Sequence, residues 1–334
     1  MSVFSLRFFL TVLLTVFFLL GGAATLPEVQ AAKDKSNFNY RLIAGRKYYS
    51  AREIAGRLRL RVIKNNTRYE LIGKAGRMVF NPKKRYGSFN GTVLTYNFEP
   101  VVEGNQLYIS ASDFFNHVQI LFNPRALKPA GIRTILLDPG HGGNDKGASG
   151  VRFQEKFLNL QIAKRVQKHL SKYGYKVKLT RVNDRRMELS QRSNAANSSK
   201  ADLFVSIHMN AASNRTVSGI ETFALTAPGA PSSGSKLVQY NNYAGNNAAN
   251  NSLSLAWFVQ NAVIKATKAA DRGVKHSRFV VLRETRCPAI LIECGFISNR
   301  TEENKLGSAA YQEKIAEAIA RGIYNYHVNL RKNH

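Results

Sequence analysis

Cysteine and acidic residues are scarce in this sequence of 334 residues. Two cysteines are too few to build a disulfide scaffold, so the folded chain must rely on apolar cores or on a bound metal. Only 21 aspartates and glutamates stand against 49 lysines and arginines, which gives a formal charge of +28 and predicts an anionic partner. Hydrophobic residues make up 44% of the chain, and this excludes disorder as its main state.

Long apolar runs are also lacking, with one exception near the N-terminus. Arg7 precedes an uncharged run over residues 8–20, and small residues follow it as far as Ala32. The run has about 13 residues, whereas a membrane-spanning helix needs about 20. The pattern is typical of a signal peptide, so we expect residues 1–31 to be removed on export to the periplasm or the cell exterior. A retained membrane anchor is the alternative.

The two cysteines, Cys287 and Cys294, flank a short apolar run that predicts a buried strand. Along a strand they would lie roughly 20 Å apart, at about 3.3 Å per residue. A disulfide needs Cα atoms within about 7 Å. We therefore expect both cysteines to be reduced.

A polar stretch with proline and glycine, residues 125–131, predicts a linker between two domains. Before it, residues 38–124 predict a small α+β module with an internal near-repeat, 48–54 against 108–114. Each copy predicts a strand, a serine N-cap, a helix and a further strand, which in the second copy is 118–122. This region resembles the copper amine oxidase N-terminal-like domain, which implies a binding or positioning role.

Residues 132–330 alternate between strand and helix patterns. The predicted strands are 133–138, 176–180, 203–207, 219–225, 279–282 and 289–293. The predicted helices are 154–173, 187–198, 253–269 and 309–328. This order predicts an α/β domain with a mainly parallel sheet flanked by helices. In such sheets, reactive residues gather at the carboxyl ends of the strands.

Three polar side chains stand at such positions, and a fourth begins a helix. His141, His208 and Glu293 follow or close predicted strands, and Glu155 begins a predicted helix. Two imidazoles and one carboxylate are a usual protein ligand set for catalytic zinc, and the remaining carboxylate can then act as a base.

Two other classes of site are disfavoured. The glycine-rich segment 140–150 lacks the third glycine of a dinucleotide-binding fingerprint. The sequence also lacks the H-E-x-x-H pair of short-spacer metalloproteases. Any metal ligands must therefore come from segments that are distant in sequence.

Five elements of the sequence occur together in an order that resembles one enzyme family. They are segment 138–148, Glu155, and segments 206–211, 219–222 and 293–299. They resemble the zinc-dependent N-acetylmuramoyl-L-alanine amidases of the amidase_3 family, over about residues 132–328.

This resemblance implies that His141, Glu155 and His208 hold Zn²⁺ and that Glu293 is the catalytic acid and base. The implied reaction is hydrolysis of the amide between N-acetylmuramic acid and the L-alanine of the stem peptide. Peptidoglycan is then the expected partner, with anionic envelope polymers on the basic surface, and we expect a monomer. A nucleic-acid role is not expected for an exported chain without a known binding motif. A zinc endopeptidase of the stem peptide and an inactive wall-binding protein remain as alternatives.

Some features are left without a role. Segment 226–252 is rich in alanine, asparagine, glycine and serine, and we expect a flexible loop facing the substrate. In some members of the resembled family, a helix at about this place blocks the zinc cleft, but apolar residues are sparse here. Glu221 is unassigned. The other histidines, 117, 169, 276, 327 and 334, lack a comparable context, and we expect surface or solvated positions.

Overall fold

The computed structural model of the chain describes residues 32–33, 37–129 and 131–333. The expected signal peptide lies outside these residues. Residues 32–334 belong to one compact unit. Among the described helices, none combines the length and the apolar character needed to cross a membrane.

The C-terminal part of the chain is built on six strands in the order β12, β11, β13, β18, β14 and β17. Their bounds are β11 Thr134–Pro139, β12 Lys176–Leu179, β13 Leu203–Asn210, β14 Ile220–Leu225, β17 Asp271–Ser277 and β18 Ala289–Phe296. Neighbouring strands are parallel except for β14 and β18, which pair antiparallel. The carboxyl ends of β11, β13 and β18 therefore meet at one edge.

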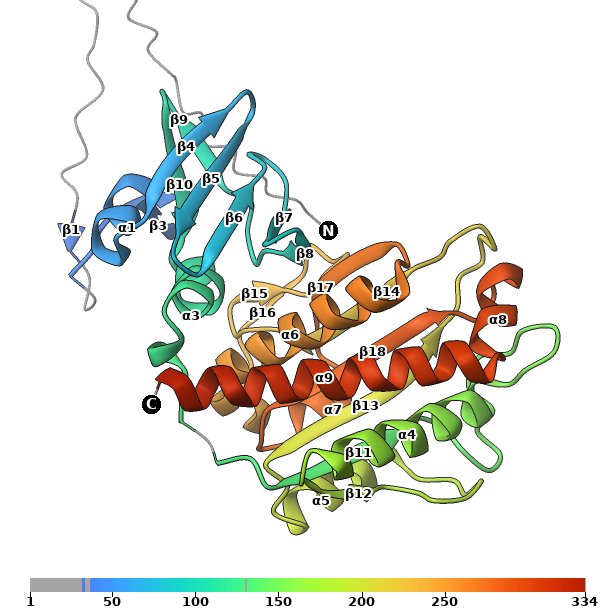
Figure 1. Cartoon of the computed structure of the whole chain (residues 1–334). Coiled ribbons are helices and arrows are strands. Elements are labelled where there is room, and N and C mark those ends of the chain that lie inside the picture. The colour runs from blue at the N-terminus through green and yellow to red at the C-terminus, as the bar shows by residue number, and fades with distance from the viewer. Residues whose placement is uncertain (1–31, 34–36, 130, 334) are drawn as a thin grey trace, which may run out of the picture. The chain divides into compact units, whose positions relative to one another are not determined.

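Helices cover both faces of this sheet, as Figure 1 shows. On one face lie α4 (Glu155–Lys172), α6 (Ala249–Thr267) and α9 (Ala309–Asn333), which share the larger apolar core. On the other face, α5 (Leu189–Ser198) and α7 (Val280–Arg283) pack over a smaller core. The predicted fold class, a mainly parallel sheet flanked by helices with a smaller N-terminal α+β part, is confirmed.

The N-terminal part is rich in strands. Its elements are β1 Ala32–Lys33, β2 Asn39–Ile43, β3 Arg46–Ser50, α1 Ala51–Leu58, β4 Arg61–Asn65, β5 Arg68–Gly73, β6 Gly76–Phe80, β7 Tyr86–Phe89, β8 Thr92–Thr95, β9 Val101–Glu103, β10 Gln106–Ser110, α2 Ala111–Asp113 and α3 Gln119–Phe122. Strands β4 to β8 form a meander that joins the larger sheet, where β8 pairs with β17 at Leu94 and Val274. The remaining strands form a second sheet.

The near-repeat has the predicted caps but only one of the predicted second strands. The Ser50 hydroxyl accepts the N–H of Glu53, and the Ser110 hydroxyl accepts the N–H of Asp113. After the second cap, the chain stays helical from residue 111 to 122, with a π-helical stretch in the middle. The predicted strand 118–122 is therefore wrong. Val118, Ile120 and Leu121 are buried and Gln119 and Phe122 are partly buried, so a run this short does not distinguish the helix period from the strand period.

The predicted strand 279–282 is also wrong, because these residues enter helix α7. The actual strand, β17, lies just before it and carries Asp271, Arg272 and Lys275. These polar residues have partners inside the fold, so a search for apolar residues at strand spacing does not identify the strand. The short apolar run that follows packs Val281 and Leu282 into the smaller core.

Both cysteines are free in the structure. Cys287 precedes β18, as predicted from the sequence, whereas the strand extends past the predicted end at 293 and includes Cys294. Burial raises the pKa of the Cys287 thiol to about 12, so this thiol is poorly reactive.

We predicted residues 125–131 to be a linker. Several polar contacts join residues that precede this stretch to residues that follow it. The backbone N–H of Val93 donates to Asp271, and the indole of Trp257 donates to the carbonyl of Phe89. The Arg85 guanidinium donates to the carbonyls of Pro231 and Ser235. The division into two domains stays a prediction, and these contacts indicate that the two parts are held together.

Two buried histidines meet where the two parts touch. His117 and His276 are both nearly inaccessible, and their Nε2 atoms lie 3.1 Å apart. The expectation of surface or solvated positions is wrong for both. At this distance one ring must donate from Nε2 and the other accept there, so protonation of both Nε2 atoms is unfavourable. The Thr95 carbonyl lies 3.0 Å from His276 Nε2, and Asp113 lies 3.2 Å from His117 Nδ1.

This pair predicts a loss of stability in acid. Burial, together with the charges of His117 and Arg85, lowers the pKa of His276 to about 3. The unfolded chain protonates this residue near pH 6.5, so the free energy of unfolding should fall between pH 6.5 and pH 3, by on the order of 4 kcal/mol from this group. Denaturant unfolding across this range should show a flatter pH dependence for His276→Gln than for the wild type. His169→Gln is the control. An unchanged slope in His276→Gln would contradict the prediction.

Candidate active site

A cavity of about 350 Å³ lies at the carboxyl edge of the sheet. We call it the histidine cavity, and it is lined by Asp138, His141, Asp145, Leu189, Arg192, His208, Arg278, Phe279, Val280, Val281, Leu291 and Glu293. Three of the four site residues predicted from the sequence are therefore in its wall. The fourth, Glu155, contacts the two histidines from the other side, at the start of α4.

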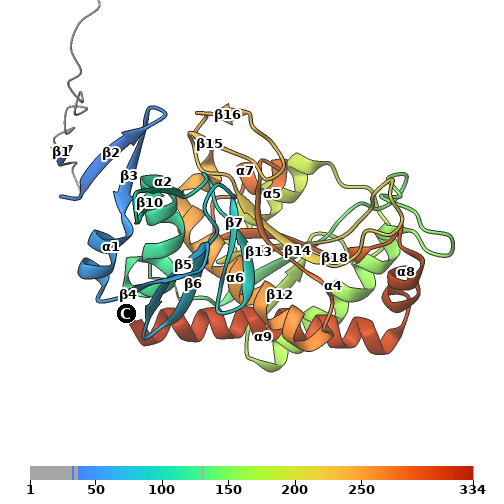
Figure 2. The same cartoon turned by 90° about the horizontal axis from the view of Figure 1, so that it is seen from above.

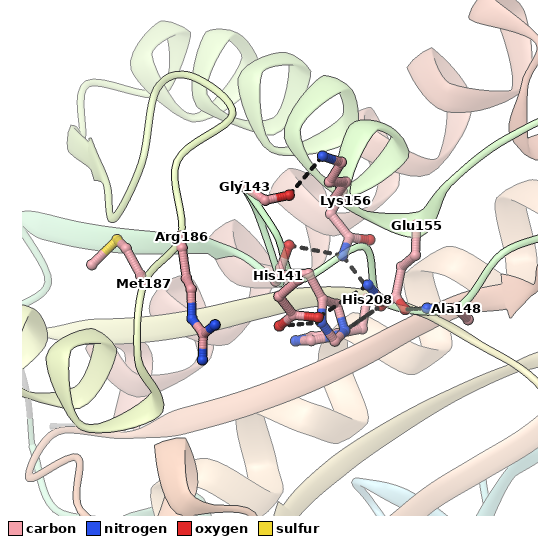
Figure 3. A network of polar contacts seen from close by, with 12 residues as sticks. His141, Gly143, Ala148, Glu155, Lys156, Arg186, Met187 and His208 are labelled. Carbon is pink, nitrogen blue, oxygen red and sulfur yellow. Dashed lines mark hydrogen bonds and ion pairs between the residues drawn. The ribbon is translucent and has the colours of Figure 1, made fainter.

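His141, Glu155 and His208 converge on one point, as Figure 3 shows. Glu155 Oε1 lies 3.2 Å from His141 Nε2 and 2.9 Å from His208 Nδ1. One ligand atom from each of the three residues lies within 4.8 Å of the others. Two imidazole nitrogens and a carboxylate oxygen at this spacing fit a catalytic zinc site, in which a further position stays open for water or substrate.

The orientation of the His141 ring is fixed by Asp145. The carboxylate of Asp145 lies 2.8 Å from His141 Nδ1, so it accepts the proton there and leaves Nε2 with a free lone pair toward Glu155. The Asp145 carboxylate is itself held by the N–H of Gly147. A carboxylate behind a histidine ligand in this way fixes the tautomer and strengthens the ligand.

Glu155 is buried and fully hydrogen-bonded. Its Oε2 accepts the N–H of Ala148, and its Oε1 accepts the N–H of Met209 and an amide N–H of Asn159. Burial by itself raises the pKa of this carboxyl, but contacts with His141 and His208 outweigh it and hold the pKa well below its usual value. Glu155 is therefore an anion, as a metal ligand must be.

Two glycines make room for this cluster. A Cβ on Gly140 would lie 2.1 Å from the ring of His208, and a Cβ on Gly147 would lie 2.5 Å from Glu155 Oε2. Gly147 also has a φ of +64°. His141 itself adopts a φ of +59°, a left-handed conformation that is uncommon for a residue with a side chain. The glycine-rich segment thus lets the backbone approach the site closely, as the sequence predicts.

Glu293 faces the same cavity from β18. It is paired in register with His208 on β13 and with Glu221 on β14. Its Oε2 atom is buried and has no hydrogen-bond partner among the described residues. Burial raises the pKa of Glu293 well above its usual value, and the negative charges of Glu155 and Glu221 raise it further. A carboxyl with a raised pKa can both take and return a proton near neutral pH.

Several supporting residues were not found from the sequence. Asp145 stands in the glycine-rich segment without a role assigned to it. Glu221 was left open, and in the structure it is buried and paired with Arg272 and Lys275. The spacing of Asp145 four residues after His141 is the one signal that the sequence offers. The contacts of Glu221 come from strand pairing and have no local signal.

An α/β sheet with this ligand cluster and an unpaired carboxyl beside it is suited to metal-dependent hydrolysis. Comparison with known proteins agrees with this class. The profile of a family described as N-acetylmuramoyl-L-alanine amidase matches residues 135–325. The N-acetylmuramoyl-L-alanine amidase AmiA of Escherichia coli K12 is 36% identical over 228 residues, which cover 61% of this chain and 79% of AmiA.

Two further similarities extend this match. The uncharacterised protein YqiI of Bacillus subtilis is 36% identical over 203 residues, which cover 61% of this chain and 89% of YqiI. The crystal structure of an N-acetylmuramoyl-L-alanine amidase from Clostridium difficile 630 superposes with a TM-score of 0.51 and 40% identity, and covers 59% of this chain and 97% of that one. The chain belongs to the N-acetylmuramoyl-L-alanine amidase family, and the resemblance stated from the sequence is confirmed.

The role of Asp145 leads to a prediction. Asp145→Asn removes the carboxylate that holds the His141 tautomer, and it should lower the affinity for Zn²⁺ by about 10- to 100-fold. Titration of metal-free protein against a chelator of known affinity measures this. Asn144→Ala, a change at the exposed neighbouring position, is the matched control and should leave the affinity unchanged. Equal affinities for Asp145→Asn and the wild type would remove Asp145 from this role.

Proposed function

We propose that this protein is a zinc-dependent peptidoglycan amidase. It hydrolyses the amide between N-acetylmuramic acid and the L-alanine of the stem peptide. Membership of the amidase family supports the reaction class. The observation that carries the mechanism is the buried, unpaired Glu293 carboxyl, which lines the same cavity as two histidines of the ligand cluster.

His141, Glu155 and His208 would hold the metal through His141 Nε2, His208 Nδ1 and the Glu155 carboxylate. Bound Zn²⁺ would supply Lewis acidity, which polarises the scissile carbonyl and makes water a stronger acid. Neutral imidazoles leave most of the positive charge of the ion in place, and Glu155 provides one negative charge.

Glu293 moves the proton. As a carboxylate, it accepts a proton from the attacking water at its unpaired oxygen. It then donates that proton to the nitrogen of the leaving L-alanine, so the amine departs in a neutral form. The raised pKa of this carboxyl favours the first step, because it makes the carboxylate a stronger base toward the attacking water. Glu221, which pairs with Arg272 and Lys275, also raises the pKa of Glu293.

Export and partners complete the proposal. The substrate lies outside the cytoplasm, which agrees with the signal peptide predicted at residues 1–31. The basic chain can bind anionic envelope polymers through its positive charge, and such binding weakens as salt rises. We expect a monomer, and segment 38–124 to position the catalytic part on the wall. Segment 226–252 forms a short hairpin and the start of α6, and its expected flexibility stays a prediction.

Glu293→Gln tests the proposed proton carrier. The amide keeps the shape but cannot carry a proton, so hydrolysis should fall by about 10²- to 10⁴-fold while Zn²⁺ stays bound. Elemental analysis measures the metal, and release of soluble fragments from purified peptidoglycan measures the activity. Glu317→Gln, a change on the exposed face of α9, is the matched control. Full turnover in Glu293→Gln would show that another group moves the proton.

The products decide between the amidase and its alternatives. Purified muropeptides incubated with the protein should give free stem peptides and intact glycan in mass spectrometry. A chelator should stop this reaction, and added Zn²⁺ should restore it. Peptides cut internally would instead indicate an endopeptidase. If a folded, zinc-loaded protein forms no product, the chain is a binding protein and the proposal is wrong.

A further inference from the structure

A second cavity, of about 370 Å³, opens near the same edge of the sheet. We call it the arginine cavity, and it is lined by Ser149, Gly150, Val151, Arg215, Ser298, Arg300 and Glu303. It shares no lining residue with the histidine cavity. No step of the proposed reaction uses it, so its two arginines need another explanation.

The arginine cavity is built by segments that lead directly away from the site residues. Ser149 follows Ala148, whose N–H donates to Glu155 Oε2 over 2.8 Å. Ser298 follows β18, the strand that carries Glu293, and its hydroxyl accepts the N–H of Ala212 over 3.0 Å. Figure 1 shows α8 (Arg300–Leu306) beside this end of β18. An extended peptide advances about 3.3 Å per residue, so a few residues beyond the scissile bond reach this cavity.

One side chain fixes the backbone of both arginines. The amide of Asn299 donates to the carbonyl of Arg215 over 3.0 Å. The carbonyl oxygen of the same side chain accepts the N–H groups of Thr301 and Glu302. Asn299 therefore caps α8, whose first residue is Arg300. Both arginine residues are exposed, and within the described ranges neither guanidinium has a hydrogen bond or an ion pair. Their donors are available to a ligand.

The acidic residue of the cavity does not cancel this charge. Glu303 is buried, and its Oε1 accepts the N–H groups of Arg152 and Phe153 over 2.5 and 3.0 Å. Burial by itself raises the pKa of this carboxyl, but the backbone N–H groups and the charge of Arg300 outweigh it and lower the pKa. Glu303 therefore keeps one negative charge, and its Oε1 atom is held by the backbone of the loop that lines the cavity. Two guanidinium groups remain for one carboxylate, so the cavity keeps a net positive charge.

We propose that the arginine cavity is a subsite for a carboxylate of the stem peptide. Arg215 and Arg300 bind this carboxylate, and the peptide leaves the ligand cluster along the segment that starts at Ala148. Guanidinium groups bind carboxylates with paired, charge-assisted hydrogen bonds, so they select an acid over the amide of the same shape. The inference rests on the proposed function, because it takes the stem peptide as the group that is released.

The test compares two substrates that differ in charge alone. One is a muramoyl peptide with free carboxylates, and the other has the same carboxylates converted to carboxamides. The wild type should prefer the free acid by about tenfold in kcat/KM, the size expected for two exposed ion pairs. In the double variant Arg215→Gln, Arg300→Gln, this preference should fall to about one, with kcat/KM for the carboxamide unchanged.

The matched control carries the same change of charge at the opposite edge of the sheet. Arg133 precedes β11 and Arg286 precedes β18, and both are exposed. The double variant Arg133→Gln, Arg286→Gln should keep the tenfold preference. If the wild type hydrolyses acid and carboxamide equally well, or if the Arg215, Arg300 variant keeps the preference, the subsite does not exist.

A binding measurement separates this inference from the proposed function. Free stem tripeptide is titrated into the zinc-loaded protein and followed by NMR. It should bind the wild type about tenfold more tightly than the Arg215, Arg300 variant, and the difference should shrink as salt is raised. If neither muramoyl substrate is hydrolysed but this difference is found, the reaction is wrong and the subsite stands. Equal binding to both proteins overturns the subsite.

Discussion

The structure of the site depends on one buried carboxylate. Glu155 carries a negative charge in an interior position, where an unpaired charge would be very unfavourable. This charge is stabilised by two imidazoles, an asparagine amide and two backbone N–H groups from separate segments. The start of α4, the end of β13 and the glycine-rich segment must all be in place before this charge is satisfied. The arrangement of His141, Glu155 and His208 therefore depends on the folding of the whole C-terminal part.

The same requirement explains two buried arginines that touch no ligand atom. Arg181 donates to the carbonyls of Pro139 and Gly140, and Arg192 donates to the carbonyls of Pro139 and His141. Arg192 also pairs with the buried Asp138. These bonds hold the segment in which His141 takes its left-handed conformation. Such a conformation costs on the order of 1 to 3 kcal/mol, and it persists only where the surroundings hold it.

That His141, Glu155 and His208 lie together could be predicted, because the order of the motifs is a property of the sequence. His141 and His208 follow strands, and parallel strands bring their carboxyl ends together. Elements whose polar residues are satisfied inside the fold could not be predicted in this way. Strand β17 lacks an apolar strand pattern because it carries Asp271 and Lys275, which have partners inside the fold. The buried pair of His117 and His276 comes from two distant parts of the chain. No local pattern distinguishes such histidines from surface ones.

The antiparallel pairing of β14 with β18 affects the pKa of the Glu293 carboxyl. It places Glu221 in register with Glu293, on the side away from His208. Arg272 and Lys275 of β17 form ion pairs with Glu221 on the side of this residue that faces β17. Glu155 and Glu293 can thus differ widely in proton affinity although both lie beside His208. With an apolar neighbour in place of Glu221, only burial and the charge of Glu155 would raise the pKa of Glu293.

The N-terminal part contacts a segment that also contacts the wall of the histidine cavity. Arg85 of that part donates to the carbonyl of Pro231, and Arg278 of the histidine cavity donates to the carbonyl of the preceding residue, Ala230. Figure 2 shows the hairpin of β15 (Ala230–Pro231) and β16 (Val238–Gln239) near α7, which follows Arg278. Two guanidinium groups from different parts therefore hold one short hairpin. By these contacts, the N-terminal part supports the wall of the histidine cavity, whatever else it binds.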